Sequence, residues 1–185
     1  MLLTPGPTPV PEFVRKAMAD ITIHHRTEEF EAIFKNTREL LIEIYDMPEV
    51  VILASSGTGA MEACVTNLTH KKALTINSGK FGERFGKICA AFGIDYTEIK
   101  NEWNTPVSVE AVVNAIKADS SIDAVFIQIC ESAGGLRHPV EEIAAEIKKI
   151  NKDITIVADG ITAVGVEKID TTNLDAVVTG SQKAL

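Results

Sequence analysis

Lys183 is the residue of this chain whose type and position could do covalent chemistry. It follows the apolar run 175–179, and a lysine at the tip of a buried strand can attack an aldehyde as an amine nucleophile. The alternative is an ordinary exposed lysine in a loop. Asp159 follows a second apolar run, 153–158, where a carboxylate is costly to bury unless a cationic partner meets it. Here the alternative is a simple turn, because Gly160 comes next.

A run of small and hydroxyl-bearing residues, 55–59 (Ser-Ser-Gly-Thr-Gly), stands between an apolar run and a helical pattern. At the start of a helix such a run presents free backbone N–H groups to an anion, and a phosphate group suits it. It is not a dinucleotide-binding fingerprint, because Glu62 stands where the third glycine would be. No Gly-Lys-Ser/Thr follows as in a P-loop. A tight turn that needs glycine is the alternative.

Two further strand ends carry candidate ligand contacts. Phe81 follows the apolar run 73–77, and it could be a stacking platform for a flat ligand or a core residue of the next helix. The loop 131–135 (Glu-Ser-Ala-Gly-Gly) has room for the edge of a ligand, although its composition is ordinary for a loop. A phosphate site, a flat platform, a carboxylate for a ring nitrogen and a lysine for an aldehyde are together what pyridoxal phosphate requires.

Short β-branched runs that alternate with helical patterns have to position these residues. Strands are expected at 50–54, 73–77, 95–99, 122–129, 153–158 and 175–179, and helices near 59–69, 81–92, 108–118 and 139–151. Strands that are apolar on both faces and separated by helices predict a three-layer α/β fold, with a mostly parallel sheet between two layers of helices. Sites in such folds lie where the carboxyl ends of the strands meet loops.

The first part of the chain has a different pattern. Residues 4–11 contain four prolines, which exclude a helix or a central strand and predict an extended arm. Residues 27–45 have apolar residues at helical spacing, with Thr27 as the N-cap. We therefore expect an N-terminal arm and first helix over residues 1–26, followed by one α/β domain over residues 27–185.

Composition excludes several classes of protein. The 185 residues include 18 Lys and Arg against 26 Asp and Glu, and a net charge of −8 argues against nucleic-acid and anionic-membrane partners. No apolar run approaches the ~20 residues of a membrane-spanning helix, and no secretory signal is visible, so a cytoplasmic location is expected.

Cys64, Cys89 and Cys130 lack the spacing of a disulfide or zinc framework and are expected to be buried free thiols. The four histidines lack metal-ligand spacing, so no metal site is predicted.

Four segments, in this order, resemble the class V aminotransferases, which are pyridoxal phosphate enzymes of fold type I. They are 56–59 (Ser-Gly-Thr-Gly), 131–132 (Glu-Ser), 158–160 (Ala-Asp-Gly) and 180–185 (Gly-Ser-Gln-Lys-Ala-Leu). The resemblance is strongest to the alanine–glyoxylate, serine–glyoxylate and serine–pyruvate group, whose opening arm resembles residues 4–9 and 24–26 as well. It implies a homodimer that moves an amino group from a small amino acid of the alanine or serine type to a keto acid such as glyoxylate or pyruvate.

The resemblance also implies roles for single residues. Lys183 would form the internal aldimine with pyridoxal phosphate and act as the general base, and Asp159 would pair with the protonated ring nitrogen. Phe81 would stack on the ring, where the group often carries a larger aromatic residue. The other implied contacts are Thr58, Gly59, Ala60 and Gln182 at the phosphate, Ser132 near the ring hydroxyl and Ile161 beneath the ring.

Two departures from related proteins bear on these expectations. Phe81 and Gln182 stand where sulfur-transferring relatives typically carry histidines, which favours amino transfer. The chain stops two residues after Lys183, whereas related enzymes continue into a small C-terminal domain, so an incomplete large domain of the pyridoxal-phosphate-dependent transferase type is expected. The alternatives are a lyase of the same fold, a catalytically inactive fragment and a nucleotide-binding α/β module.

Overall fold

Two compact units make up the chain, Met1–Ile52 and Leu53–Leu185. The computed structural model describes residues 3–184 of them. The domain boundary predicted after residue 26 stays a prediction. The sheet and the candidate site both lie in the second unit.

A five-stranded sheet organises the second unit. Its strands are β1 (Lys72–Asn77), β2 (Tyr96–Lys100), β3 (Ile122–Gln128), β6 (Thr155–Asp159) and β7 (Ala176–Val178). They lie in the order β2-β1-β3-β6-β7, and each neighbouring pair is parallel. Five of the six predicted strands are therefore confirmed. Because the chain passes from β1 outward to β2 and returns to β3 on the other side of β1, a topological switch point lies between β1 and β3.

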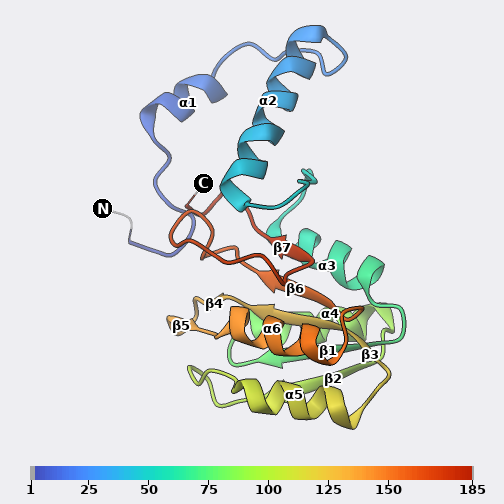
Figure 1. Cartoon of the computed structure of the whole chain (residues 1–185). Helices are drawn as coiled ribbons and strands as arrows, with labels where there is room; N and C mark the ends of the chain where they lie inside the picture. The colour runs from blue at the N-terminus through green and yellow to red at the C-terminus, as the bar shows by residue number, and fades with distance from the viewer. Residues whose placement is uncertain (1–2, 185) are drawn as a thin grey trace. The chain divides into compact units, whose positions relative to one another are not determined.

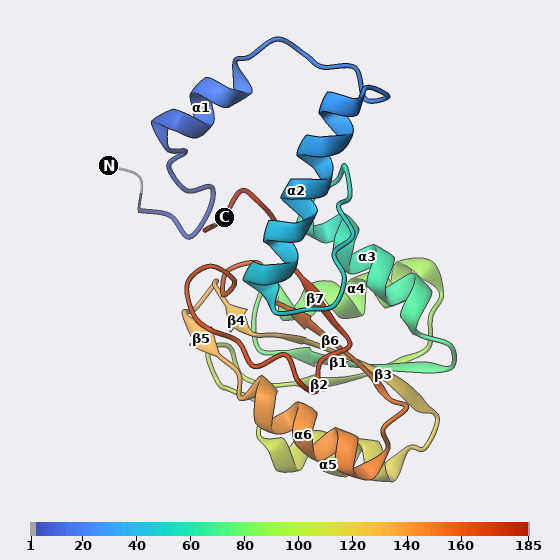
Figure 2. The ribbon, with the colours of Figure 1, turned by 45° about the horizontal axis from the view of Figure 1, so that its top comes forward.

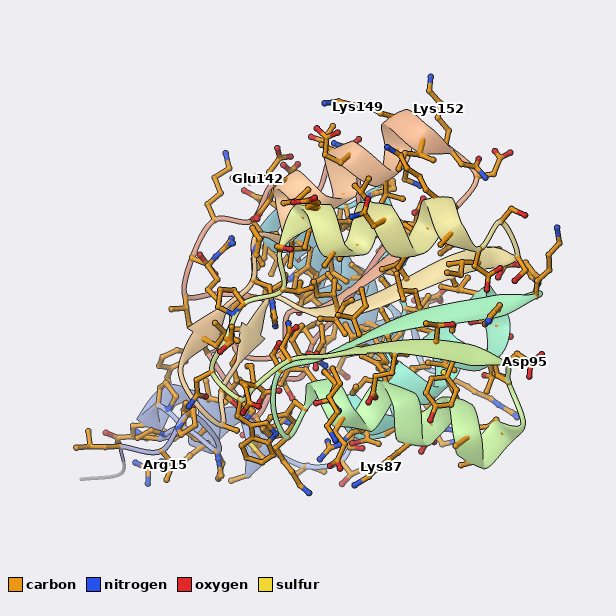
Figure 3. The ribbon with its side chains drawn as sticks, turned by 90° about the horizontal axis from the view of Figure 1, so that it is seen from below. Arg15, Lys87, Asp95, Glu142, Lys149 and Lys152 are labelled. Atoms are coloured by element: carbon orange, nitrogen blue, oxygen red, sulfur yellow. The ribbon has the colours of Figure 1, made fainter. Side chains whose placement is uncertain are left out.

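Helices cover both faces of this sheet, as Figures 1 and 2 show. Helices α3 (Gly57–Leu68) and α4 (Gly82–Phe92) pack on one face, and α5 (Val109–Ala118) and α6 (Val140–Ile150) on the other. In α6 the buried residues recur at helical spacing, while Glu142 and Lys149 point away from the sheet (Figure 3). The predicted three-layer α/β fold is confirmed.

Apolar side chains in the middle of the strands form the core. Leu74, Phe126 and Ile156 have no exposed surface, and the rings of Phe85 and Phe126 lie 5.2 Å apart. Strands that are buried on both faces explain why their sequences are almost continuously apolar rather than alternating.

One predicted strand is wrong and one small ribbon was not predicted. Residues 50–54 form no strand, and Val51 is 80% exposed. Their β-branched composition favours an extended backbone, but a strand also needs a hydrogen-bonded neighbour, and the described strands pair without them. The ribbon consists of β4 (Cys130–Glu131) and β5 (Leu136–Arg137), which pair antiparallel directly after β3.

Among its described residues, the first unit contains two helices, α1 (Glu12–Met18) and α2 (Glu28–Tyr45). The predicted N-cap of α2 is confirmed, because the Thr27 hydroxyl accepts a hydrogen bond from the amide of Phe30. Residues 4–11 form neither helix nor strand, as their prolines require. Within residues 3–184, no helix combines the length and the apolar composition needed to cross a membrane.

The three cysteines are free thiols, as expected. Only Cys89 is buried, however, whereas Cys64 and Cys130 are half-buried. Cys130 departs from the apolar core because it begins the β4–β5 ribbon beyond the end of β3.

Candidate active site

The start of α3 forms one wall of a pocket at the carboxyl ends of the strands. Ser56 is the N-cap of α3, and its hydroxyl accepts a hydrogen bond from the amide of Gly59. Among the described residues, this leaves the amides of Gly57 and Thr58 at the helix start without an intrahelical acceptor. A Cβ on Gly57 would lie 2.3 Å from Cδ1 of Ile161, so a larger residue at this position would displace the Ile161 side chain. The helix start can therefore receive an anion.

Arg84 connects this helix start to the aromatic wall. Its Nη1 donates a hydrogen bond of 2.8 Å to the Thr58 hydroxyl. Its guanidinium carbon lies 4.9 Å from the centre of the Phe81 ring, within the range of a cation–π contact. Because the Thr58 hydroxyl accepts from Arg84, its own proton is free to be donated to an anion.

Phe81 is the N-cap of α4 and belongs to the loop after β1. Its amide donates a hydrogen bond to Oε2 of Glu131, and its carbonyl accepts one from Nε2 of Gln128, both at 2.8 Å. The half-buried ring lies along the pocket. Phe81 is thus half-buried at the pocket rather than in the core, and its use as a stacking platform for a flat ligand stays a prediction.

Asp159 ends β6 and is 4% exposed. Its Oδ1 accepts a hydrogen bond of 2.9 Å from the amide of Ile161. Burial raises the pKa of the Asp159 carboxyl from 3.8 to about 6, and the charge of Glu131 also acts to raise it. The Ile161 amide, the Gln128 side chain and the charge of Arg84 act in the opposite direction. A cation bound beside Asp159 would stabilise its ionised form.

The loop after β7 brings Gln182 and Lys183 to the same pocket. Lys183 is half-buried, and its amide donates a hydrogen bond to the carbonyl of Gly180. A Cβ on Gly180 would lie 2.4 Å from Oε1 of Gln182. Glycine at this position therefore lets the Gln182 side chain fold back over the loop.

Most of the predicted site residues meet around this one pocket, which has a volume of about 110 Å³ and is partly open to solvent. Its lining includes Thr58, Phe81, Ser132, Asp159, Ile161, Gln182 and Lys183. Gly59 and Ala60 were predicted as phosphate contacts but do not line it, and both amides donate within the helix start, to the side chain and carbonyl of Ser56.

Sequence reasoning missed three lining residues, Arg84, Cys130 and Thr162. Arg84 stands one helical turn after Phe81, so the spacing of three residues could have indicated it. Thr162 follows the Asp-Gly pair, and its hydroxyl donates to the carbonyl of Cys130 at 3.2 Å. This contact could not be inferred from a local pattern, because it depends on the pairing of β3 with β6.

The fold and the site define a class of protein: a three-layer α/β domain with a ligand pocket at the carboxyl ends of parallel strands, in a sheet that has a switch point. Comparison with known proteins names the family. Residues 2–185 match the family described as Aminotransferase class-V. The chain therefore belongs to the class V aminotransferase family.

Individual relatives agree with this assignment. An uncharacterized aminotransferase from Helicobacter pylori is 50% identical over 184 residues, which is 100% of this chain and 50% of that protein. The serine–glyoxylate aminotransferase from Methylorubrum extorquens is 27% identical over 192 residues, covering 100% of this chain and 48% of the relative. The solved structure of an aspartate aminotransferase from Thermus thermophilus is 31% identical with a TM-score of 0.90, covering 98% of this chain and 52% of that one. The chain thus spans about half the length of the relatives it matches.

Proposed function

We propose that this chain provides the pyridoxal phosphate site of an aminotransferase, with Lys183 as the residue that carries the cofactor. The observation that supports this most is the convergence of a half-buried lysine, a buried carboxylate, an aromatic ring and a helix start on one pocket. These groups come from four segments that lie far apart in the sequence, so their meeting is not a consequence of proximity along the chain.

The residues present fit the cofactor by charge and by shape. Asp159 is a buried carboxylate whose pKa is raised by burial, and a protonated ring nitrogen beside it would stabilise the ionised form. The helix start at Gly57 and Thr58 would hold the phosphate, with the Gln182 side chain close by. Phe81 would cover one face of the ring and Ile161 the other, and Ser132 would meet the ring hydroxyl.

When bound, pyridoxal phosphate supplies an electron-withdrawing ring that stabilises negative charge at the α-carbon of an amino acid. The protein's part is to hold that ring and to move protons. Asp159 would place a negative charge where the ring nitrogen is held, and Nζ of Lys183 would take the α-proton of the substrate and later return a proton. Phe81 and Ile161 would shield the ring faces from water.

The substrates we propose are a small amino acid of the alanine or serine type and a keto acid such as glyoxylate or pyruvate. Support comes from relatives named for glyoxylate, a serine–glyoxylate and an L-aspartate–glyoxylate aminotransferase, each 27% identical. Amino transfer in the presence of the keto acid distinguishes this function from that of a lyase, which would release product without it. A homodimer and a cytoplasmic location complete the proposal.

Borohydride reduction in the presence of pyridoxal phosphate, followed by peptide mapping by mass spectrometry, tests the site. We expect one pyridoxyl group, on Lys183, and none in Lys183→Ala. The matched control is Lys80→Ala, which removes an exposed lysine beside Phe81 and should leave the labelling unchanged. Label scattered over surface lysines in the unaltered chain would contradict the proposal, and tight binding of NAD or ATP instead would favour the nucleotide-binding alternative.

A further inference from the structure

Glu131 is a buried carboxylate that the proposed function leaves without a role. It ends β4, and only 1% of its surface is exposed. A buried charge is costly unless it is matched by hydrogen-bond donors or by an opposite charge. Its partners therefore indicate why the chain places a carboxylate there.

Three backbone amides meet the two oxygens of Glu131. Oε2 accepts from the amides of Phe81 and Gly82, both at 2.8 Å, and Oε1 accepts from the amide of Ala133 at 3.2 Å. Two of these donors lie at the start of α4 and the third lies in the loop of Glu131 itself. The carboxylate thus joins the loop after β1 to the loop after β3.

The start of α4 explains the need for this partner. Its N-cap position is held by Phe81, whose side chain cannot accept a hydrogen bond, and the cap has no side-chain bond of its own. Glu131, on a different strand, accepts from the unpaired amides at the helix start in its place, and its negative charge suits a helix N-terminus. An aromatic ring can therefore occupy the N-cap because a distant carboxylate does the capping.

The surrounding residues hold this contact in one geometry. A Cβ on Gly79 would lie 2.5 Å from Cγ of Glu131, so glycine lets the loop close on the carboxylate. On the other side of Phe81, the buried Gln128 donates to the Phe81 carbonyl at 2.8 Å. The peptide groups before and after Phe81 are thus both bound by side chains from β3 and β4.

We propose that Glu131 is a positioning residue, which fixes the Phe81 ring at the pocket wall by capping α4 from β4. The inference rests on the proposed function, since the ring so held is the surface on which the cofactor would stack. Glu131 does not itself line the pocket. Its effect on ligand binding should therefore pass through Phe81.

A double-mutant cycle on pyridoxal phosphate affinity tests this route. Glu131→Ala should weaken binding by about ten-fold in the unaltered chain but by less than about two-fold in a Phe81→Leu background, because the ring it positions is gone. The circular dichroism of the bound cofactor should fall with the affinity. Glu98→Ala is the matched control: Glu98 is a half-buried strand carboxylate bonded to Asn77, outside the pocket lining, and its loss should leave affinity unchanged.

A second measurement needs no cofactor. The amides of Phe81 and Gly82 should exchange their hydrogens about ten-fold faster or more in Glu131→Ala than in the unaltered chain. Glu131→Gln should lie in between, because its carbonyl can still accept from α4 while its amide group faces the Ala133 donor. This isosteric variant also separates positioning from a failure to fold.

The outcomes separate the two proposals. If Glu131→Ala lowers the affinity equally in the unaltered chain and in the Phe81→Leu background, the positioning role is overturned. Unchanged amide exchange in Glu131→Ala would overturn it as well. If the unaltered chain is not labelled at Lys183, the proposed function fails instead, and amide exchange still decides whether Glu131 holds Phe81.

Discussion

The middles of the strands and their carboxyl ends differ in the polarity of the side chains that they bury. In the middle, Leu74, Phe126 and Ile156 are fully buried and apolar. At the ends, polar side chains are buried as well, beside apolar ones such as Val178. Among the described residues, every buried polar side chain except Thr75 ends a strand or directly follows one: Asn77, Ser78, Gln128, Glu131, His138 and Asp159.

This difference separates what stabilises the fold from what prepares the site. Apolar burial in the strand middles supplies the driving force for folding. Burial of a polar group at a strand end is unfavourable unless the group has a hydrogen-bond partner. Oε1 of Gln128 and Oδ1 of Asn77 nevertheless lie buried without such a partner among the described residues. The hydroxyl of Thr75, in the middle of β1, is the exception among the strand-middle side chains, since it too is buried without a partner among the described residues.

The largest effect should come from the strand middles. Phe126→Ala removes a fully buried ring that packs on Phe85, and it should lower the free energy of unfolding by about 3–5 kcal/mol. Urea unfolding measures this. Phe92→Ala is the control, since Phe92 is 54% exposed and its loss should cost well under about 1 kcal/mol. Similar losses for both variants would remove the distinction between core and surface.

At the strand ends, removal of a buried charge should raise the free energy of unfolding rather than lower it. The pKa of Asp159 is raised from 3.8 to about 6, so the folded chain keeps a proton there that the unfolded chain has lost. Asp159 therefore costs stability as the pH rises from about 4 to 6, and Asp159→Asn should stabilise the cofactor-free chain at pH 7 by up to about 3 kcal/mol. The same variant should retain pyridoxal phosphate poorly. Unfolding by urea at several pH values checks the first expectation, and a destabilised Asp159→Asn chain would contradict it.

His138 is the matched control for this pH dependence. Burial lowers the pKa of its imidazole from 6.5 to about 4, and its Nδ1 accepts from the amide of Val107. Below pH 6.5 the His138 imidazole binds a proton in the unfolded chain but stays neutral in the folded chain until about pH 4. His138 therefore lowers the stability of the folded chain as the pH falls. In His138→Asn the effect of Asp159 remains, so the free energy of unfolding should rise as the pH falls from 7 to about 4. In Asp159→Asn the effect of His138 remains, so the free energy of unfolding should fall over the same range. Identical pH profiles for the two variants would contradict both assignments.

The same contrast explains what could be predicted from the sequence. The strand middles and α6 are visible through apolar periodicity, and the turns at Asp159 and Lys183 follow directly from them. The run 50–54 has a similar apolar pattern but no pairing partner, which no local pattern reveals. Contacts between elements distant in the sequence could not be predicted either, because the Arg84–Thr58 hydrogen bond depends on how α3 and α4 pack.

The smallest effect should separate two serine caps that are locally alike. Ser56 caps α3 beside the pocket and Ser108 caps α5 away from it, each by accepting from the amide three residues on, at 3.3 and 3.1 Å. Either serine replaced by alanine should lower the free energy of unfolding by about 1 kcal/mol. Only Ser56→Ala should also weaken pyridoxal phosphate binding, by a few-fold, because loss of the cap loosens the helix start that would receive the phosphate. Titration of both variants measures this, and equal affinities would mean that the start of α3 is a structural cap without a part in binding.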